Sequence, residues 1–238
     1  MKKKALDIIF EDDHLVVVNK PSGLLVIPDR QQNPNNLQDL LRQKYGDIFI
    51  VHRIDRDTSG LVVFAKTKEA HAHLCQQFEA RSTKKIYWAL VKGNLRQEEG
   101  EIEAAIDTKL NSKGMVKISD KGKAAHSSYK RLEQLSSGSL VEVQIHTGRL
   151  HQIRIHMKSI GYPLLIDPIY GEAIGVFLSD YKKNFNVKKG QEERPVIDRL
   201  TLHAFSLTLT HPVSQETISF EAPLHKDFKV AIKQLKVK

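Results

Sequence analysis

Apolar and polar positions alternate in short blocks along the chain, and most blocks predict a strand or a short helix. Two runs rich in β-branched residues, at 14–19 and 60–66, predict buried strands. Asn36 precedes leucines at helical spacing and predicts a helix cap, with Gly46 just past the helix end, and Thr67 predicts the cap of a second helix. Further strands are expected at 85–92, 101–106, 115–119, 124–132, 139–146, 200–210 and 217–221, and further helices at 150–160 and 226–235.

The order of these elements indicates the fold class. Strands follow one another through short turns with few helices between them, which favours an α+β fold with a mixed, mostly antiparallel central sheet and flanking helices. Residues 1–238 are expected to form a single domain with its core at about 6–225. The Lys-rich stretch 174–199 breaks the pattern and is predicted to be a surface insertion.

Composition narrows the class of protein. The 238 residues are 40% hydrophobic and 27% charged, which is typical of a globular chain and excludes a wholly disordered one. The single cysteine, Cys75, excludes an intrachain disulfide and a zinc site built from cysteines. No apolar run is long enough to cross a bilayer and no signal peptide is visible, so a cytoplasmic protein is expected. A net charge of +9 favours a phosphate-rich partner such as nucleic acid.

The densest polar cluster is the segment 52–60, which lies between two apolar runs. Asp55 is flanked by Arg53 and Arg56, whose charges favour the carboxylate and make it a candidate nucleophile. The alternative is a surface loop of exposed ion pairs without chemical function. The same loop approximates the D-x-D-x-T pattern of metal-dependent phosphatases, but Ser59 replaces the threonine and no later acidic pair follows.

A second cluster spans 145–156 and contains three histidines. His146, His151 and His156 are spaced by five residues, whereas a helical zinc pair needs a spacing of four, so ordinary hydrogen bonding is expected. Arg154 lies on the predicted helix of this cluster. Tyr87, on the strand at 85–92, is either a core residue or a platform on which a base stacks.

Five segments, in this order, resemble the RluA-type family of RNA pseudouridine synthases. They are IIFEDDHLVVVNKPSGLLVIP from Ile8, HRIDRDTSGLVVFAKT from His52, KIYWALVKG from Lys85, TGRLHQIRIH from Thr147 and LTLHAFSL from Leu200. The resemblance covers nearly the whole chain. It implies the catalytic fold of pseudouridine synthases, without the small S4-type domain that many relatives carry.

The resemblance also implies an activity, which is the cofactor-free isomerisation of uridine to pseudouridine in structured RNA, either tRNA or rRNA. Asp55 would be the catalytic carboxylate, Tyr87 would stack on the flipped base and assist proton removal, and Arg154 would pair with Asp55. The expected substrate-binding residues are His52, Arg53, Arg149, Lys182, Lys183, Lys188 and Lys189. Arg53 would help to fill the gap left by the flipped nucleotide.

The expected partners are RNA alone, with no membrane, no obligate protein partner and no metal, and the expected state is a monomer. An RNA-binding protein or RNA chaperone that kept the fold is the alternative of another class.

Overall fold

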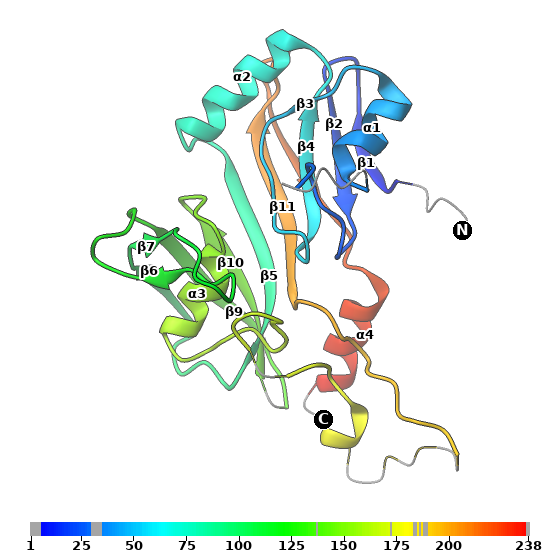
Figure 1. Ribbon diagram of the computed structural model, residues 1–238, viewed down its shortest axis with the longest axis vertical. Helices are drawn as coiled ribbons and strands as arrows, with labels where there is room; N and C mark the ends of the chain where they lie inside the picture. The colour runs from blue at the N-terminus through cyan, green and yellow to red at the C-terminus, as the bar shows by residue number, and fades with distance from the viewer. Residues whose placement is uncertain are drawn as a thin grey trace. The chain divides into compact units, whose positions relative to one another are not determined.

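The chain packs as two compact units in the structure, which is a computed structural model (Figure 1). Unit 1 comprises Met1–Tyr87 and His203–Pro223, and unit 2 comprises Trp88–Leu202 and Leu224–Lys238. The described residues are 6–29, 35–136, 138–171, 173–182, 185, 187 and 190–236. Neither unit is one continuous segment, and the single domain expected over 1–238 stays a prediction.

Unit 1 is built on a mixed, mostly antiparallel sheet. Its strand order is β1 (Ile8–Glu11), β2 (Leu15–Lys20), β4 (Ser59–Ala65) and β11 (Leu202–Thr210), with β3 (Phe49–Ile50) paired to β4 and β12 (Thr217–Glu221) paired to β11. The β4–β11 pair is parallel, whereas the pairs β1–β2, β2–β4, β3–β4 and β11–β12 are antiparallel. The predicted α+β class with a mixed sheet is therefore confirmed.

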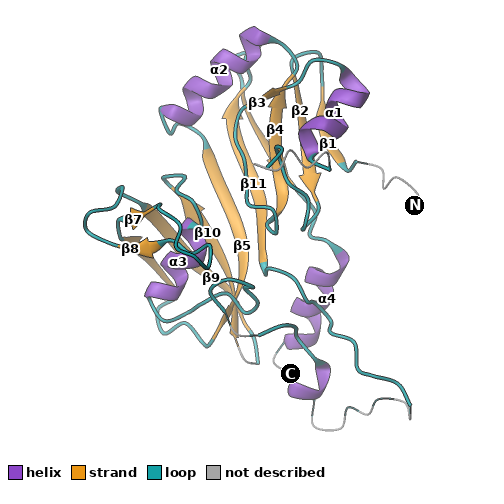
Figure 2. Cartoon of the chain, in the orientation of Figure 1, coloured by secondary structure: helices purple, strands orange, loops and turns teal. Residues whose placement is uncertain are grey.

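Helices cover both faces of the central strands of unit 1 (Figure 2). On one face Val17 and Val63 pack against Leu74 of α2 (Lys68–Glu79). On the other face the next residues along the same strands, including Val18, pack against Leu41 of α1 (Leu37–Tyr45). Because both faces are buried, β2 and β4 have continuous apolar sequences instead of alternating ones.

The helix caps predicted from the sequence are confirmed. The side chain of Asn36 accepts a hydrogen bond from the N–H of Asp39 at 3.0 Å, and α1 ends at Gly46 with a φ of 78°. Thr67 Oγ1 accepts from the N–H of Ala70 at 3.2 Å and begins α2. Each cap satisfies one of the backbone donors that a helix leaves unpaired in its first turn.

Unit 2 contains a second group of strands and two helices. Its strand order is β5 (Lys84–Lys92, of which residues 84–87 belong to unit 1), β10 (Gly138–Ile145), β9 (His126–Gln134) and β6 (Glu99–Glu103), with a separate pair β7 (Ile106–Asp107) and β8 (Lys117–Ile118). The helices are α3 (Gln152–Ser159) and α4 (Lys226–Leu235), together with the single turn η1 (Leu178–Asp180). Within the described ranges, no helix has the length and apolar character needed to cross a membrane.

Several boundaries in unit 2 differ from the prediction, and the backbone explains two of the differences. The strand expected at 101–106 is split into β6 and β7, because the chain leaves the β9 ladder after Glu103 and Ile106 pairs with β8. The helix expected from residue 150 begins at Gln152, because His151 adopts a left-handed backbone conformation with a φ of 54°. The spacing of apolar residues along the sequence indicated neither change.

The ends of the Lys-rich stretch 174–199 are anchored in the core of unit 2. Val176 and Ile197 form a β-bridge, are each 1% exposed, and belong to the apolar cluster that includes Phe228 of α4. Lys182 lies on the surface and its Nζ donates to Oε1 of Gln234 on α4. Lys183, Lys188 and Lys189 lie outside the described residues.

The parallel contact between β4 and β11 requires a glycine. Gly60 pairs with Ala204 and has a φ of 110°, a conformation that side chains disfavour. A Cβ atom at residue 60 would lie 2.2 Å from the carbonyl oxygen of Ala204. The two backbones therefore approach closely only because residue 60 has no side chain.

We expect Gly60→Ala to lower the free energy of unfolding by about 3 kcal/mol or more, because strain and a backbone clash add together. Gly46→Ala is the matched control: Gly46 also has a positive φ, but nothing lies within 4 Å of the added Cβ. That change should cost only about 1 kcal/mol. Urea unfolding measures the free energy of unfolding of both variants. Equal decreases in the two variants would contradict the steric explanation.

Candidate active site

The loop between β3 and β4 presents the predicted carboxylate from an anchored backbone. Ile54 is buried in the apolar cluster on the α1 side of the sheet, so the chain is fixed one residue before Asp55. Asp55 is half-buried, whereas Arg53 and Arg56 are exposed. Nε of Arg56 pairs with Oδ1 of Asp57 at 3.2 Å. This exposed pair is worth little in stability.

A buried lysine ties the loop to the turn after β2. Lys20 is 0% exposed, and its Nζ donates to the carbonyl oxygens of Pro21 (3.0 Å), Leu24 (2.7 Å) and Arg56 (2.8 Å). These contacts use all three N–H donors of the ammonium group. The N–H of Gly23 also donates to the carbonyl of Arg56 at 3.0 Å. The residue that follows Asp55 is therefore held by two independent hydrogen bonds.

The end of the loop is held by a histidine from β11. Oγ of Ser59 lies 2.9 Å from Nδ1 of His203, and Nε2 of His203 lies 3.2 Å from the carbonyl oxygen of Ala222. A carbonyl oxygen only accepts hydrogen bonds, so Nε2 carries a proton and donates to Ala222. Ser59 and His203 are both fully buried. The sequence analysis gave no role to His203.

His52 supports the neighbouring strand. Its Nε2 accepts a hydrogen bond from the N–H of Val63 at 3.1 Å, and its ring stacks on Phe78 with centroids 4.6 Å apart. Burial, and then the positive charge of Lys85, lower the pKa of His52 to about 3. The ring is therefore neutral at physiological pH, with its proton on Nδ1. These contacts give His52 a part in the fold, and its predicted part in substrate binding stays a prediction.

Tyr87 and Asp55 are the two predicted catalytic residues that belong to unit 1. Tyr87 packs against the same apolar cluster that contains Ile54. Burial, and then the negative charge of Asp55, raise the pKa of the Tyr87 phenol well above its usual value. The phenol is therefore protonated at neutral pH and lies close enough to the carboxylate to respond to its charge.

Arg154, the third predicted catalytic residue, belongs to unit 2 and is held by Asp167. Its Nε donates to Oδ2 at 2.8 Å and its Nη2 to Oδ1 at 2.6 Å, and the two side chains are 2% and 1% exposed. The N–H groups of Ile169 and Tyr170 also donate to Asp167. Burial alone would raise the pKa of Asp167, but the hydrogen bonds and charge of Arg154 outweigh burial and lower it.

The sequence analysis did not find this pair. The available signal was an aspartate in the segment Ile166–Gly171, which sequence spacing alone does not connect to Arg154. The predicted pairing of Arg154 with Asp55 stays a prediction.

The remaining polar residues of the second cluster are also held by hydrogen bonds. Nε of Arg149 donates to the carbonyl of Ala124 at 3.1 Å. Each of the three histidines makes a hydrogen bond, as predicted: His146 with Ser128 (3.0 Å), His151 with Tyr170 (3.0 Å) and His156 with Ser127 (3.0 Å).

Comparisons with known proteins agree on one family. Its model, described as RNA pseudouridylate synthase, matches residues 14–159, a range that contains Asp55, Tyr87 and Arg154. The chain is 39% identical over 229 residues to the ribosomal large subunit pseudouridine synthase D of Pseudomonas aeruginosa, covering 94% of this chain and 69% of that protein. It is 38% identical over 221 residues to the dual-specificity RNA pseudouridine synthase RluA of Pasteurella multocida, covering 92% of this chain and 93% of that protein.

A solved structure has the same fold. The human protein named RNA pseudouridylate synthase domain containing 1 superposes with a TM-score of 0.71 at 26% identity, covering 94% of this chain and 86% of that chain. The similarity therefore extends over both units.

Because the ring of His52 is neutral in the folded protein, we expect the free energy of unfolding to depend on pH. Between about pH 3 and pH 6.5 the unfolded chain binds a proton at His52 that the folded chain does not, so stability falls as pH falls. This residue contributes at most about 1.4 kcal/mol per pH unit. We expect His52→Gln to remove that slope from urea unfolding curves between pH 4.5 and 6.5. An unchanged slope would show that His52 is not buried as a neutral ring.

Because the Arg154–Asp167 pair is buried, we expect its loss to lower the free energy of unfolding strongly. Asp167→Asn leaves the guanidinium of Arg154 buried without its counter-charge and should cost about 3–5 kcal/mol in urea unfolding. Glu98→Gln is the control, because the Glu98 carboxylate that pairs with Arg131 is 79% exposed. The free energy of unfolding of Glu98→Gln should fall by less than about 1 kcal/mol. Similar losses in the two variants would contradict the assignment.

Proposed function

Because the chain belongs to the RNA pseudouridylate synthase family, and so isomerises uridine in RNA to pseudouridine, we propose that Asp55 is its catalytic carboxylate. The observation that carries this proposal is that Tyr87 packs against the same apolar cluster as Ile54, the neighbour of Asp55, and that the charge of Asp55 contributes to the raised pKa of the Tyr87 phenol. This places a carboxylate that can act at the sugar near an aromatic ring on which a flipped uracil can stack.

The reaction itself needs no co-substrate. The bond between N1 of uracil and C1′ of the ribose breaks, a bond between C5 and C1′ forms, C5 loses a proton and N1 gains one. The number of atoms in the nucleotide does not change. The carboxylate of Asp55 acts at the sugar, either by attacking it or by promoting loss of a sugar proton.

We assign Tyr87 to stacking on the flipped base. Its phenol stays protonated at neutral pH, so it can donate a hydrogen bond and present the ring face but is not itself ready to accept the proton of C5. This narrows the role implied by the family resemblance, which included assistance in proton removal. Stacking of a base on an aromatic ring contributes about 1–3 kcal/mol.

The proposed substrate is ribosomal or transfer RNA. The names of the relatives support this choice, since one acts on the large ribosomal subunit and another has dual specificity for RNA. The net charge of +9 suits a polyanionic partner. Arg53 and Lys182 are exposed and suited to contact phosphates. A cytoplasmic monomer remains the predicted state of the protein.

The decisive experiment measures tritium released from C5 of labelled uridine, with rRNA and tRNA from a strain that lacks this protein tested separately. Asp55→Asn keeps the size of the side chain and removes its charge, so we expect release to fall by at least about 10³-fold. Asp57→Asn is the matched control, since its carboxylate pairs with the exposed Arg56. Release by this variant should stay within a few-fold of wild type.

Filter binding of the same RNA separates catalysis from recognition. We expect Asp55→Asn to bind RNA like wild type while releasing no tritium. Equal release by wild type and Asp55→Asn would show that another carboxylate is catalytic. Binding without release by the wild-type protein would favour the RNA-binding alternative.

A further inference from the structure

One face of the β6–β9–β10 strands in unit 2 is polar. Ser127 and Ile102 point to the opposite face, where Ser127 is fully buried and contacts Gln152 and His156 of α3. Since side chains alternate along a strand, their neighbours point away from α3. The residues on this polar face are Glu99, Glu101 and Glu103 of β6, His126, Ser128 and Lys130 of β9, and Glu142 and Gln144 of β10.

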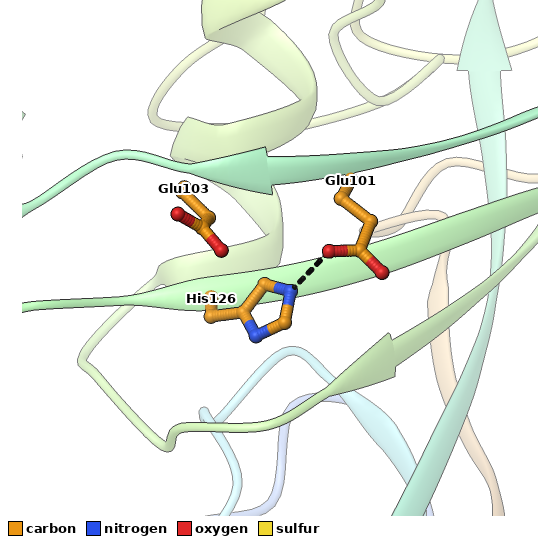
Figure 3. A group of neighbouring side chains, drawn as sticks. All are labelled: Glu101, Glu103 and His126. Carbon is orange, nitrogen blue, oxygen red and sulfur yellow. Dashed lines mark hydrogen bonds and ion pairs between the residues drawn. The ribbon is translucent and has the colours of Figure 1, made fainter.

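Three metal-binding side chains converge at one end of this face (Figure 3). One ligand atom from each of Glu101, Glu103 and His126 lies within 4.8 Å of the others. Glu103 is paired directly with His126 in the strand register, and Glu101 is two residues away on the same strand and face. Nε2 of His126 donates to Oε2 of Glu101 at 3.0 Å. The strand register itself therefore creates the cluster.

The imidazole is fixed before any ion binds. The backbone of His126 is held on both sides. Its backbone N–H donates to Oγ1 of Thr147 at 3.0 Å, and its backbone carbonyl accepts from Nε2 of Gln152 at 2.9 Å. Its ring stacks on that of His146, with centroids 4.2 Å apart and an angle of 20° between the planes. The side chain is 31% exposed, whereas that of Glu101 is 65% exposed. The imidazole ring, which would supply a nitrogen ligand, is thus held in place, and it faces two carboxylates whose side chains can adjust their positions.

The charges at this end also favour a cation. Glu103 has no hydrogen-bonded or ionic partner among the described residues, and Lys130 lies at the other end of the face, opposite Glu99. Two carboxylates that approach each other repel unless a positive charge lies between them. One imidazole and two carboxylates match the donor set that Zn²⁺ accepts, with a position left for water.

We propose that Glu101, Glu103 and His126 form a binding site for a divalent transition-metal ion, with Zn²⁺ as the best fit. The ion would link β6, the last strand in the order of this unit, to β9, and so hold an edge strand in register.

The test titrates the full-length, chelator-treated protein with ZnCl₂ in an isothermal calorimeter. We expect one Zn²⁺ per chain, and at least about 10-fold weaker binding after either His126→Gln or Glu103→Gln. Glu142→Gln removes a carboxylate from the same face outside the cluster and should bind within about 2-fold of wild type. MgCl₂ should bind far more weakly, because Mg²⁺ disfavours imidazole.

Amide hydrogen exchange gives an independent result. Bound Zn²⁺ should slow exchange in β6 of the wild-type protein and leave it unchanged in Glu103→Gln, which alters an exposed side chain and does not threaten folding. Absence of Zn²⁺ binding would overturn the proposal. So would equal binding by wild type, His126→Gln and Glu103→Gln, which would place the ion on other histidines or on Cys75.

Discussion

The ammonium group of Lys20 is buried between the turn after β2 and the loop that carries Asp55, and its hydrogen bonds join the two. A buried ammonium is stable only while its N–H donors keep their partners. If the loop moved away, Lys20 would lose the carbonyl oxygen of Arg56 as a hydrogen-bond acceptor. The position of the residue next to Asp55 is therefore coupled to the solvation of a charge.

The same constraint acts on Arg154 in unit 2, where a second buried cation is held by Asp167. In both units a buried charge is held by several hydrogen bonds, whereas the exposed pair Arg56–Asp57 contributes little. Much of the charge in the densest polar segment of the sequence is thus solvated. The strong constraints come from a lysine and an aspartate at some distance along the chain, Lys20 and Asp167.

The sequence predicted the elements that depend on local chemistry. The caps at Asn36 and Thr67 and the bounds of α4 at 226–235 follow from single residue types and from apolar spacing. The parallel β4–β11 contact, the His203–Ser59 hydrogen bond and the Arg154–Asp167 pair were not predicted, because each joins residues whose proximity only the fold creates. The charges of Arg53 and Arg56 made Asp55 a candidate nucleophile but left a surface loop of ion pairs as the alternative, and only the family motif assigned catalytic roles to Asp55 and Tyr87.

The pairing of Ser59 with His203 joins residues that are 144 positions apart. On the ribosome, the first 87 residues of unit 1 emerge long before His203–Pro223, the segment that completes this unit. Until then β4 has no parallel neighbour in β11 and the contact between Ser59 and His203 cannot form. Closing so long a loop is also slow. A nascent chain therefore carries Asp55 without the support of β11 until residues 202–210 have been synthesised, and only then does the loop acquire its last anchor.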